Sequence, residues 1–169
     1  MNMPSGEFGT ILADPPWRFS NRTVRGSPER KNHYATMLLE DIKNLPIPPA
    51  KHLYLWVPNA LLPAGLEVMA TWGFEYKTNI VWCKTKHDGS IHGGGVGWYF
   101  RSASELCLFG VKGNLRTGAK GRTQTNVLLS GRREHSIYNI IDACSPGPYL
   151  ELFARYHRPN WTSWGDQLD

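Results

Sequence analysis

The stretch from Ile11 to Trp17 is an apolar run that ends in an acid, two prolines and a large aromatic ring. Pro15 and Pro16 lack an N–H and have a fixed φ, so neither regular strand nor helix continues through them. Chemistry on the amino group of a nucleobase needs a carboxylate that accepts a hydrogen bond, carbonyl acceptors beside it, and an aromatic face for stacking. Asp14, Pro15, Pro16 and Trp17, the tetrad, are therefore the candidate reaction centre.

A purely structural role for the tetrad is the alternative. Asp followed by proline is common in turns, because Asp bonds its own backbone and proline begins turns. Trp17 could equally be a core residue. The tetrad alone leaves both interpretations open.

Elements that could position the tetrad alternate along the chain. Short apolar runs bounded by turn signals predict strands, and apolar residues at helical spacing predict helices. The predicted strands are 10–13, 52–57, 76–82, 105–111, 149–153 and 161–165, and 127–129 is either a short strand or an extended segment. The predicted helices are 38–45, 61–72, with Gly73 at its C-terminal cap, and 136–143.

This alternation predicts an α/β fold with a mainly parallel sheet and helices on both faces. We find no internal repeat and no sign of a second domain, so residues 1–169 are expected to form a single domain. Ligands of such folds bind at the carboxyl ends of the strands, where Asp14 and the residues after Phe153 both lie.

The composition of the 169 residues, 41% hydrophobic and 20% charged, is that of a globular protein. No apolar run approaches the roughly 18 residues of a membrane span, and Met1–Gly6 has no export signal pattern. Cys83, Cys107 and Cys144 are widely spaced, which favours reduced core residues and a cytoplasmic location. The six histidines show no ligand spacing, so we expect no metal.

A net charge of +5 favours a polyanionic partner, nucleic acid above all. The basic residues gather in 18–31, 84–92, 116–133 and 155–158, which read as loops. We expect 18–33 and 84–104 to be mobile until nucleic acid binds. The candidate substrate contacts are Arg18, Lys84, Trp98 and Arg101.

Seven segments together carry a family resemblance. They are Asp14–Trp17, Tyr34–Met37, Leu53–Val57, Trp72–Phe74, Trp82–Thr85, Glu105–Asn114 and Glu151–Gly165. In this order they resemble the MT-A70-like adenine methyltransferases over nearly the whole chain, from about residue 10 to residue 168. Each motif is weak alone, whereas the ordered set is specific. The family comprises S-adenosyl-L-methionine-dependent enzymes that methylate the exocyclic amine of adenine in RNA or DNA.

The resemblance implies a Rossmann-like class I methyltransferase fold with a permuted order, in which the catalytic motif comes first and the cofactor strand last. Independently of the resemblance, an adenine in a duplex must be flipped out or already unpaired to react, and Trp17 and Tyr34 are the residues expected to receive it. The resemblance also implies contacts to S-adenosyl-L-methionine, with Glu151 near its ribose and Arg133 near its carboxylate. The full implied cofactor set is Asp14, Arg133, Glu151, Phe153, Arg155, His157, Asp166 and Gln167.

Three departures from the family pattern affect these implications. Asp166 stands where the family has Asn. The acidic residue that reads the cofactor adenine in larger members has no counterpart before Asp14, and the zinc-finger region of the eukaryotic enzymes has none either. Target selection is then expected from loops, from self-association as a homodimer, or from a further partner subunit.

The residues and the resemblance lead to one expected function, methyl transfer to the N6 amine of adenine. We expect DNA rather than RNA as substrate, because the chain reads as a compact stand-alone domain. Two alternatives stay open: a non-catalytic nucleic-acid-binding subunit, and methylation of the exocyclic amine of cytosine. A cytosine-C5 enzyme is disfavoured, since no cysteine lies in a Pro-Cys loop.

Overall fold

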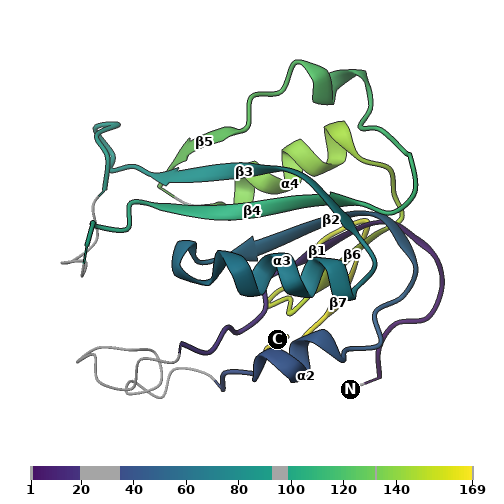
Figure 1. The fold of residues 1–169 in the computed structure, drawn as a ribbon. Coiled ribbons are helices and arrows are strands. Elements are labelled where there is room, and N and C mark those ends of the chain that lie inside the picture. The colour runs from purple at the N-terminus through teal and green to yellow at the C-terminus, as the bar shows by residue number, and fades with distance from the viewer. Residues whose placement is uncertain (1, 20–34, 93–98, 132, 169) are drawn as a thin grey trace.

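The structure is a computed structural model that describes residues 2–19, 35–92, 99–131 and 133–168. Within these residues seven strands form one sheet, in the order β5-β3-β4-β2-β1-β6-β7 (Figure 1). The strands are β1 (Phe8–Ala13), β2 (Ala50–Val57), β3 (Glu75–Lys84), β4 (Ser104–Val111), β5 (Val127–Ser130), β6 (Tyr149–Leu152) and β7 (Trp161–Trp164). The helices are α2 (Leu39–Lys43), α3 (Leu62–Thr71) and α4 (Arg133–Cys144), with 3-10 turns η1 (Asn59–Leu61) and η2 (Ala119–Arg122).

The directions of the strands decide where a site can form. β1 pairs in parallel with β2 and β6, β6 with β7, and β3 with β5, whereas β4 runs antiparallel to both β2 and β3. Among the described strands, β4 alone therefore runs against the rest, and the predicted mainly parallel α/β sheet is confirmed. The carboxyl ends of β1, β2, β3, β6 and β7 and the amino end of β4 consequently meet at one edge.

The two faces of the sheet bury different side chains. Leu53 and Leu55 belong to a core cluster that includes residues of α2 and α3. Tyr54 and Trp56 belong to a second cluster that includes Ile141 and other residues of α4. Strand side chains alternate between faces, so the apolar run of β2 covers both, and helices pack on each side (Figure 1).

The predicted elements are all present, with shifted ends. The strand expected at 127–129 exists as β5, and the helix expected at 136–143 begins earlier, as α4. Gly73 follows the cap residue Trp72 of α3 with φ of 83°, the left-handed region that glycine adopts without strain. The predicted helix end is therefore confirmed.

The segment 84–104, expected to be a loop, contains regular structure in its described part. β3 continues through Lys84, and Thr85 forms an antiparallel bridge with Ile91. The Lys84 N–H donates to the Ala103 carbonyl at 2.9 Å, and the His92 N–H donates to the Lys84 carbonyl at 2.7 Å. Residues 84–92 thus form a hairpin that extends the sheet, while 93–98 and the segment 20–34 lie outside the described residues.

In the part of the chain that the structure describes, we find no helix with the length and apolarity needed to cross a bilayer. All three cysteines are free thiols. Cys107 and Cys144 are buried as expected, whereas Cys83, near the end of β3, is half-buried.

Candidate active site

A pocket of about 480 Å³ opens at the edge where the carboxyl ends of the strands meet. Its walls come from segments that are far apart in sequence: the tetrad, the turn after β2, the start of β4, and the residues after β6 and β7. The lining residues are Asp14, Pro15, Pro16, Trp17, Phe19, Ala35, Trp56, Val57, Pro58, Asn59, Ala60, Ser102, Glu105, Phe153, Arg155, Asp166 and Gln167. The structure therefore joins the tetrad to four of the predicted cofactor residues in one cavity.

The tetrad begins directly after β1. The Asp14 N–H donates to the Leu152 carbonyl at 3.4 Å, which continues the β1–β6 pairing by one residue. Asp14 itself is half-buried. The Pro15 carbonyl accepts the Trp17 N–H at 2.8 Å, and the Pro16 carbonyl accepts the Met37 N–H at 2.9 Å. The chain thus bonds both proline carbonyls, which fixes the turn.

A carbonyl oxygen has two lone pairs, so the Pro15 carbonyl can accept one further hydrogen bond from a ligand. The stiff tetrad predicted from the prolines is therefore a backbone held by two hydrogen bonds. The Asp14 side chain lines the pocket, and its backbone is fixed by the hydrogen bond to Leu152 of β6.

Trp17 lies both in the core and in the wall of the pocket. Its side chain is only 7% exposed and belongs to the α3-side core. Its Nε1 donates to the Trp56 carbonyl at 2.8 Å, yet the residue also lines the pocket. Replacing the whole ring would create a cavity costing about 3–5 kcal/mol, so an alanine variant would test folding before it tested stacking.

The turn after β6 forms the wall next to the tetrad. Phe153 has φ of 64°, a conformation that costs a non-glycine residue about 1–3 kcal/mol and that clusters at functional sites. Its ring packs edge-to-face on Trp164 with centroids 5.6 Å apart. A side chain at Gly165 would meet the Ala154 carbonyl oxygen at 2.3 Å, so only glycine permits this close approach. The approach places Asp166 and Gln167 in the same cavity as Phe153.

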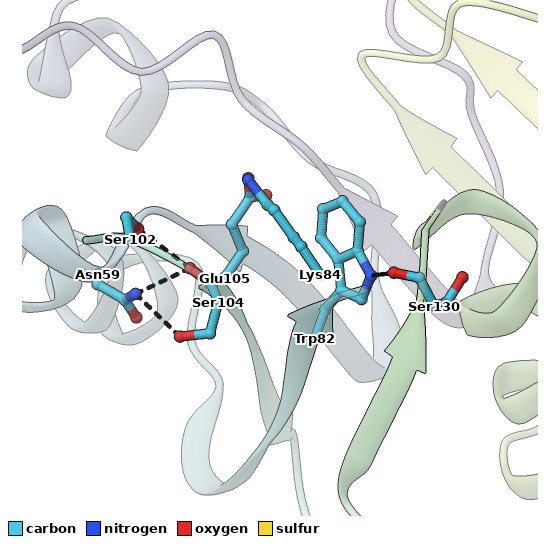
Figure 2. A network of polar contacts seen from close by, with 7 residues as sticks. All are labelled: Asn59, Trp82, Lys84, Ser102, Ser104, Glu105 and Ser130. Carbon is cyan, nitrogen blue, oxygen red and sulfur yellow. Dashed lines mark hydrogen bonds and ion pairs between the residues drawn. The ribbon is translucent and has the colours of Figure 1, made fainter. Parts of the chain in front are cut away.

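Three polar residues of the pocket were missed by sequence reasoning as site residues: Asn59, Ser102 and Glu105. Figure 2 shows how they are held. The Asn59 Nδ2 donates to the Ser104 carbonyl at 2.9 Å, and the Ser102 hydroxyl donates to the same carbonyl at 3.3 Å. The one feature of the sequence that could have indicated them is Glu105, a single acid near the start of an otherwise apolar predicted strand.

The predicted substrate residue Lys84 is tied to Glu105. Its Nζ lies 2.6 Å from the Glu105 Oε1 and 5.0 Å from the centre of the Trp82 ring (Figure 2). Both partners of the pair are 28% exposed. Lys84 therefore neighbours the pocket through Glu105 rather than lining it.

Glu151 is not among the residues that line the pocket. Because strand side chains alternate, it faces α4, where its carboxylate accepts a 2.6 Å hydrogen bond from the Tyr138 hydroxyl. Burial and the Glu151 carboxylate raise the pKa of Tyr138, so the phenol stays protonated and donates. The Arg158 guanidinium covers the Tyr138 ring at 3.5 Å.

The remaining predicted residues are placed as follows. Arg18, Arg101 and His157 are exposed, and all three lie outside the lining set. Tyr34 and Trp98 lie outside the described residues, as does the side chain of Arg133. Among the described residues no three His, Cys, Asp or Glu side chains gather as metal ligands would.

Comparison with known proteins agrees with this geometry. The chain is 33% identical over 176 residues to the N(6)-adenosine-methyltransferase catalytic subunit METTL3 of Homo sapiens, covering 97% of this chain and 29% of that protein. It is 30% identical over 175 residues to an N(6)-adenosine-methyltransferase MT-A70-like protein of Drosophila melanogaster, covering 97% of this chain and 27% of the relative.

A bacterial relative has a more similar length. The type II methyltransferase M.MunI of Mycoplasma sp is 27% identical over 193 residues, which cover 98% of this chain and 80% of that protein. By contrast, the chain spans less than a third of the METTL3 proteins it matches. The MT-A70 family model matches residues 8–167, from the first strand to the end of the pocket wall. With the tetrad and the C-terminal turn brought together in one cavity, this match shows that the chain belongs to the MT-A70 family of N6-adenine methyltransferases.

Proposed function

We propose that the chain transfers a methyl group from S-adenosyl-L-methionine to the N6 amine of adenine in nucleic acid, with DNA preferred to RNA. The observation that carries the proposal is the single pocket that contains both the tetrad and the cofactor candidates Phe153, Arg155, Asp166 and Gln167. A site that joins an acceptor frame to a cofactor wall supports group transfer between two bound molecules.

The residues of the pocket fit S-adenosyl-L-methionine chemically. The cavity lies within the range of about 300–1,000 Å³ that small-molecule sites occupy. Asp14, Glu105 and Asp166 offer carboxylates for ribose hydroxyls, an ammonium group or a sulfonium charge. Arg155 offers a guanidinium for a carboxylate, and Phe153 offers a ring for a purine face. When bound, the cofactor supplies a methyl carbon activated by positively charged sulfur.

We assign to Asp14 the activation of the adenine amine, which accepts the methyl group. The lone pair of the adenine amine is delocalised into the ring, so nitrogen becomes a better nucleophile when its N–H groups are held away from the ring plane. We assign one N–H to the Asp14 carboxylate and the other to the Pro15 carbonyl. As the new N–C bond forms and the bond from that carbon to sulfur breaks, leaving a neutral thioether, positive charge develops on nitrogen, and Asp14 stabilises that charge. The amine then loses one proton to the carboxylate or to water.

The second part of the proposal is the choice between DNA and RNA as the substrate. The METTL3 relatives are named for adenosine, which supports adenine as the target base. The preference for DNA comes from the sequence analysis alone, so the assay must contain both polymers.

The test is nucleoside mass spectrometry after the full chain has been incubated with isotopically labelled S-adenosyl-L-methionine and, separately, with DNA and RNA. Labelled N6-methyladenine in the DNA sample supports the proposal, and its appearance in RNA alone would overturn the polymer preference. Label on the cytosine amine would overturn the target base. Nucleic-acid binding without any label would favour the non-catalytic subunit.

A further inference from the structure

Two consecutive aromatic side chains stand in solvent beside the pocket. Tyr99 is 93% exposed and Phe100 is 90% exposed, whereas the next most exposed aromatic ring in the described part of the chain is Tyr156 at 66%. Burying a ring of this size is ordinarily favourable, because it removes apolar surface from water. Arg101, which follows them, is exposed as well. We call Tyr99, Phe100 and Arg101 the aromatic tip.

The residues that follow the aromatic tip, 102–104, are fixed to the wall of the pocket. Ser102 lines the pocket, and consecutive Cα atoms are about 3.8 Å apart, so the Cα of Phe100 lies within about 8 Å of that of Ser102. The Lys84 N–H holds the Ala103 carbonyl at 2.9 Å. The Asn59 amide and the Ser102 hydroxyl both donate to the Ser104 carbonyl (Figure 2). Residues 102–104 are thus fixed by hydrogen bonds, and the exposed rings that precede them in the chain are suited to contact a ligand.

The charge around the aromatic tip favours a polyanion. Besides Arg101, the neighbouring hairpin 84–92 carries an exposed Lys86. The one acid of that hairpin, Asp88, is used locally, since its carboxylate accepts the N–H and the hydroxyl of Ser90 at 2.9 and 2.6 Å. These hydrogen bonds lower the pKa of Asp88. The Asp88 carboxylate stays charged, but Arg101 and Lys86 outnumber it, so cations predominate among the exposed charged side chains of the aromatic tip and the hairpin.

Aromatic rings next to a guanidinium match a nucleic-acid strand whose bases are unpaired. Bases stack on aromatic side chains, and a guanidinium pairs with phosphate. In a continuous duplex the faces of the bases are already stacked on one another, so they are closed to Tyr99 and Phe100. Neighbouring nucleotides of a strand are at least about 3.4 Å apart, and Phe100 and Tyr99 lie two and three residues from Ser102 in the pocket wall, so their rings can meet nucleotides next to the target.

We propose that Tyr99 and Phe100 stack on unpaired bases next to the target adenine while Arg101 contacts the intervening phosphate. This inference rests on the proposed function and narrows its substrate to single-stranded or locally unpaired nucleic acid. The aromatic tip is then a determinant of strand specificity outside the catalytic pocket.

The experiment compares the full chain with a Tyr99→Ala/Phe100→Ala double variant. The probes are a fluorescein-labelled 12-nucleotide single strand with one central adenine and the blunt duplex of the same sequence. Affinity is measured by fluorescence anisotropy, and methyl transfer by nucleoside mass spectrometry. We expect the double variant to bind the single strand at least tenfold more weakly, with unchanged duplex affinity, S-adenosyl-L-methionine affinity and Tm.

Matched variants separate stacking from other effects. Tyr76→Ala removes a 41% exposed ring at the start of β3, the far end of that strand from Lys84, and should leave both affinities unchanged. Tyr99→Trp/Phe100→Trp keeps the faces of the rings and should retain single-strand binding. Loss of binding in the tryptophan variant as well as the alanine variant would overturn stacking as the cause.

The outcomes also separate this inference from the proposed function. If the wild-type chain methylates adenine and the double variant is unaffected on the single strand, the function stands and the aromatic tip loses its role. If the wild-type chain transfers no methyl group to either probe, the proposed function falls and this inference falls with it. If the double variant turns a dimer into a monomer in sedimentation without changing oligonucleotide affinity, the aromatic tip is an interface between copies of the chain.

Discussion

Polar residues lie at both ends of the parallel strands, but those at the amino end contact other parts of the chain, whereas those at the carboxyl end line a pocket. At the amino end, His52 is fully buried and lies 2.9 Å from both the Ser145 hydroxyl and the Leu115 carbonyl. The Tyr54 hydroxyl lies 2.8 Å from the same Ser145 hydroxyl. At the carboxyl end, Asp14 and its neighbours line a pocket of about 480 Å³.

The difference indicates which polar groups stabilise the fold and which can serve a ligand. Both nitrogens of His52 have partners inside the chain, so its contribution is to hold the Leu115 and Ser145 segments against the sheet. A polar group that lines a cavity can instead exchange water for ligand. Substitutions at the amino end should therefore lower stability, and substitutions at the carboxyl end should lower activity.

The largest effect is expected for Asp14→Ala. Removing the carboxylate that stabilises charge on the amine should lower the rate of methyl transfer by about 100-fold or more. The residue is half-buried at a strand end, so Tm should change little. Labelled-methyl incorporation and thermal unfolding measure the two effects. Asp14→Asn keeps the shape without the charge and is the matched control; near-full transfer by a folded Asp14→Ala protein would remove the central residue of the mechanism.

His52→Ala should show the opposite behaviour. It leaves the Leu115 carbonyl without its donor and opens a cavity, which together cost about 2–4 kcal/mol of unfolding free energy. Urea unfolding should show a lower midpoint, while activity per folded molecule stays near that of the wild type. An activity loss with unchanged stability would contradict the assignment of the amino end to folding.

A smaller effect is expected for the Asp166→Ala/Gln167→Ala double variant. Both side chains line the same pocket as the tetrad, so their loss should weaken S-adenosyl-L-methionine binding about tenfold or more, as two lost hydrogen bonds would. Isothermal titration calorimetry measures the change. Unchanged affinity would show that the cofactor wall lies elsewhere, even if the fold is intact.

The smallest effect is the pH dependence that His52 contributes. Burial lowers the pKa of His52 below its ordinary value, and the hydrogen bond to the Leu115 carbonyl opposes this only in part. The unfolded chain therefore takes up the proton first, so stability is full above the ordinary value of about 6.5 and falls as the pH drops below it. The slope is at most about 1.4 kcal/mol per pH unit. Urea midpoints between pH 7.5 and 5 should fall less in His52→Gln than in the wild type.

Much of the fold follows from local pattern. The near-continuous apolar run of β2 requires cover on both faces, and the alternation of such runs with helical spacing predicts a parallel sheet. The reversed direction of β4 had no comparable signal, because an apolar strand reads the same in either direction. Since Glu105 lies near the start of β4, that direction decides whether the acid lies at the pocket or at the opposite end of the sheet.

The sequence by itself determined the chemistry that the chain carries: a carboxylate on a stiff Asp-Pro-Pro-Trp frame at the end of a buried strand, within an ordered set of family motifs. The tertiary structure alone decided which side chains share the cavity. Glu151 and Phe153 are two residues apart, yet strand alternation places Glu151 against Tyr138, and the positive φ of Phe153 puts its ring at the pocket. Local pattern fixes the type and face of an element, whereas the pairing order and strand direction that bring distant ends together arise from long-range packing.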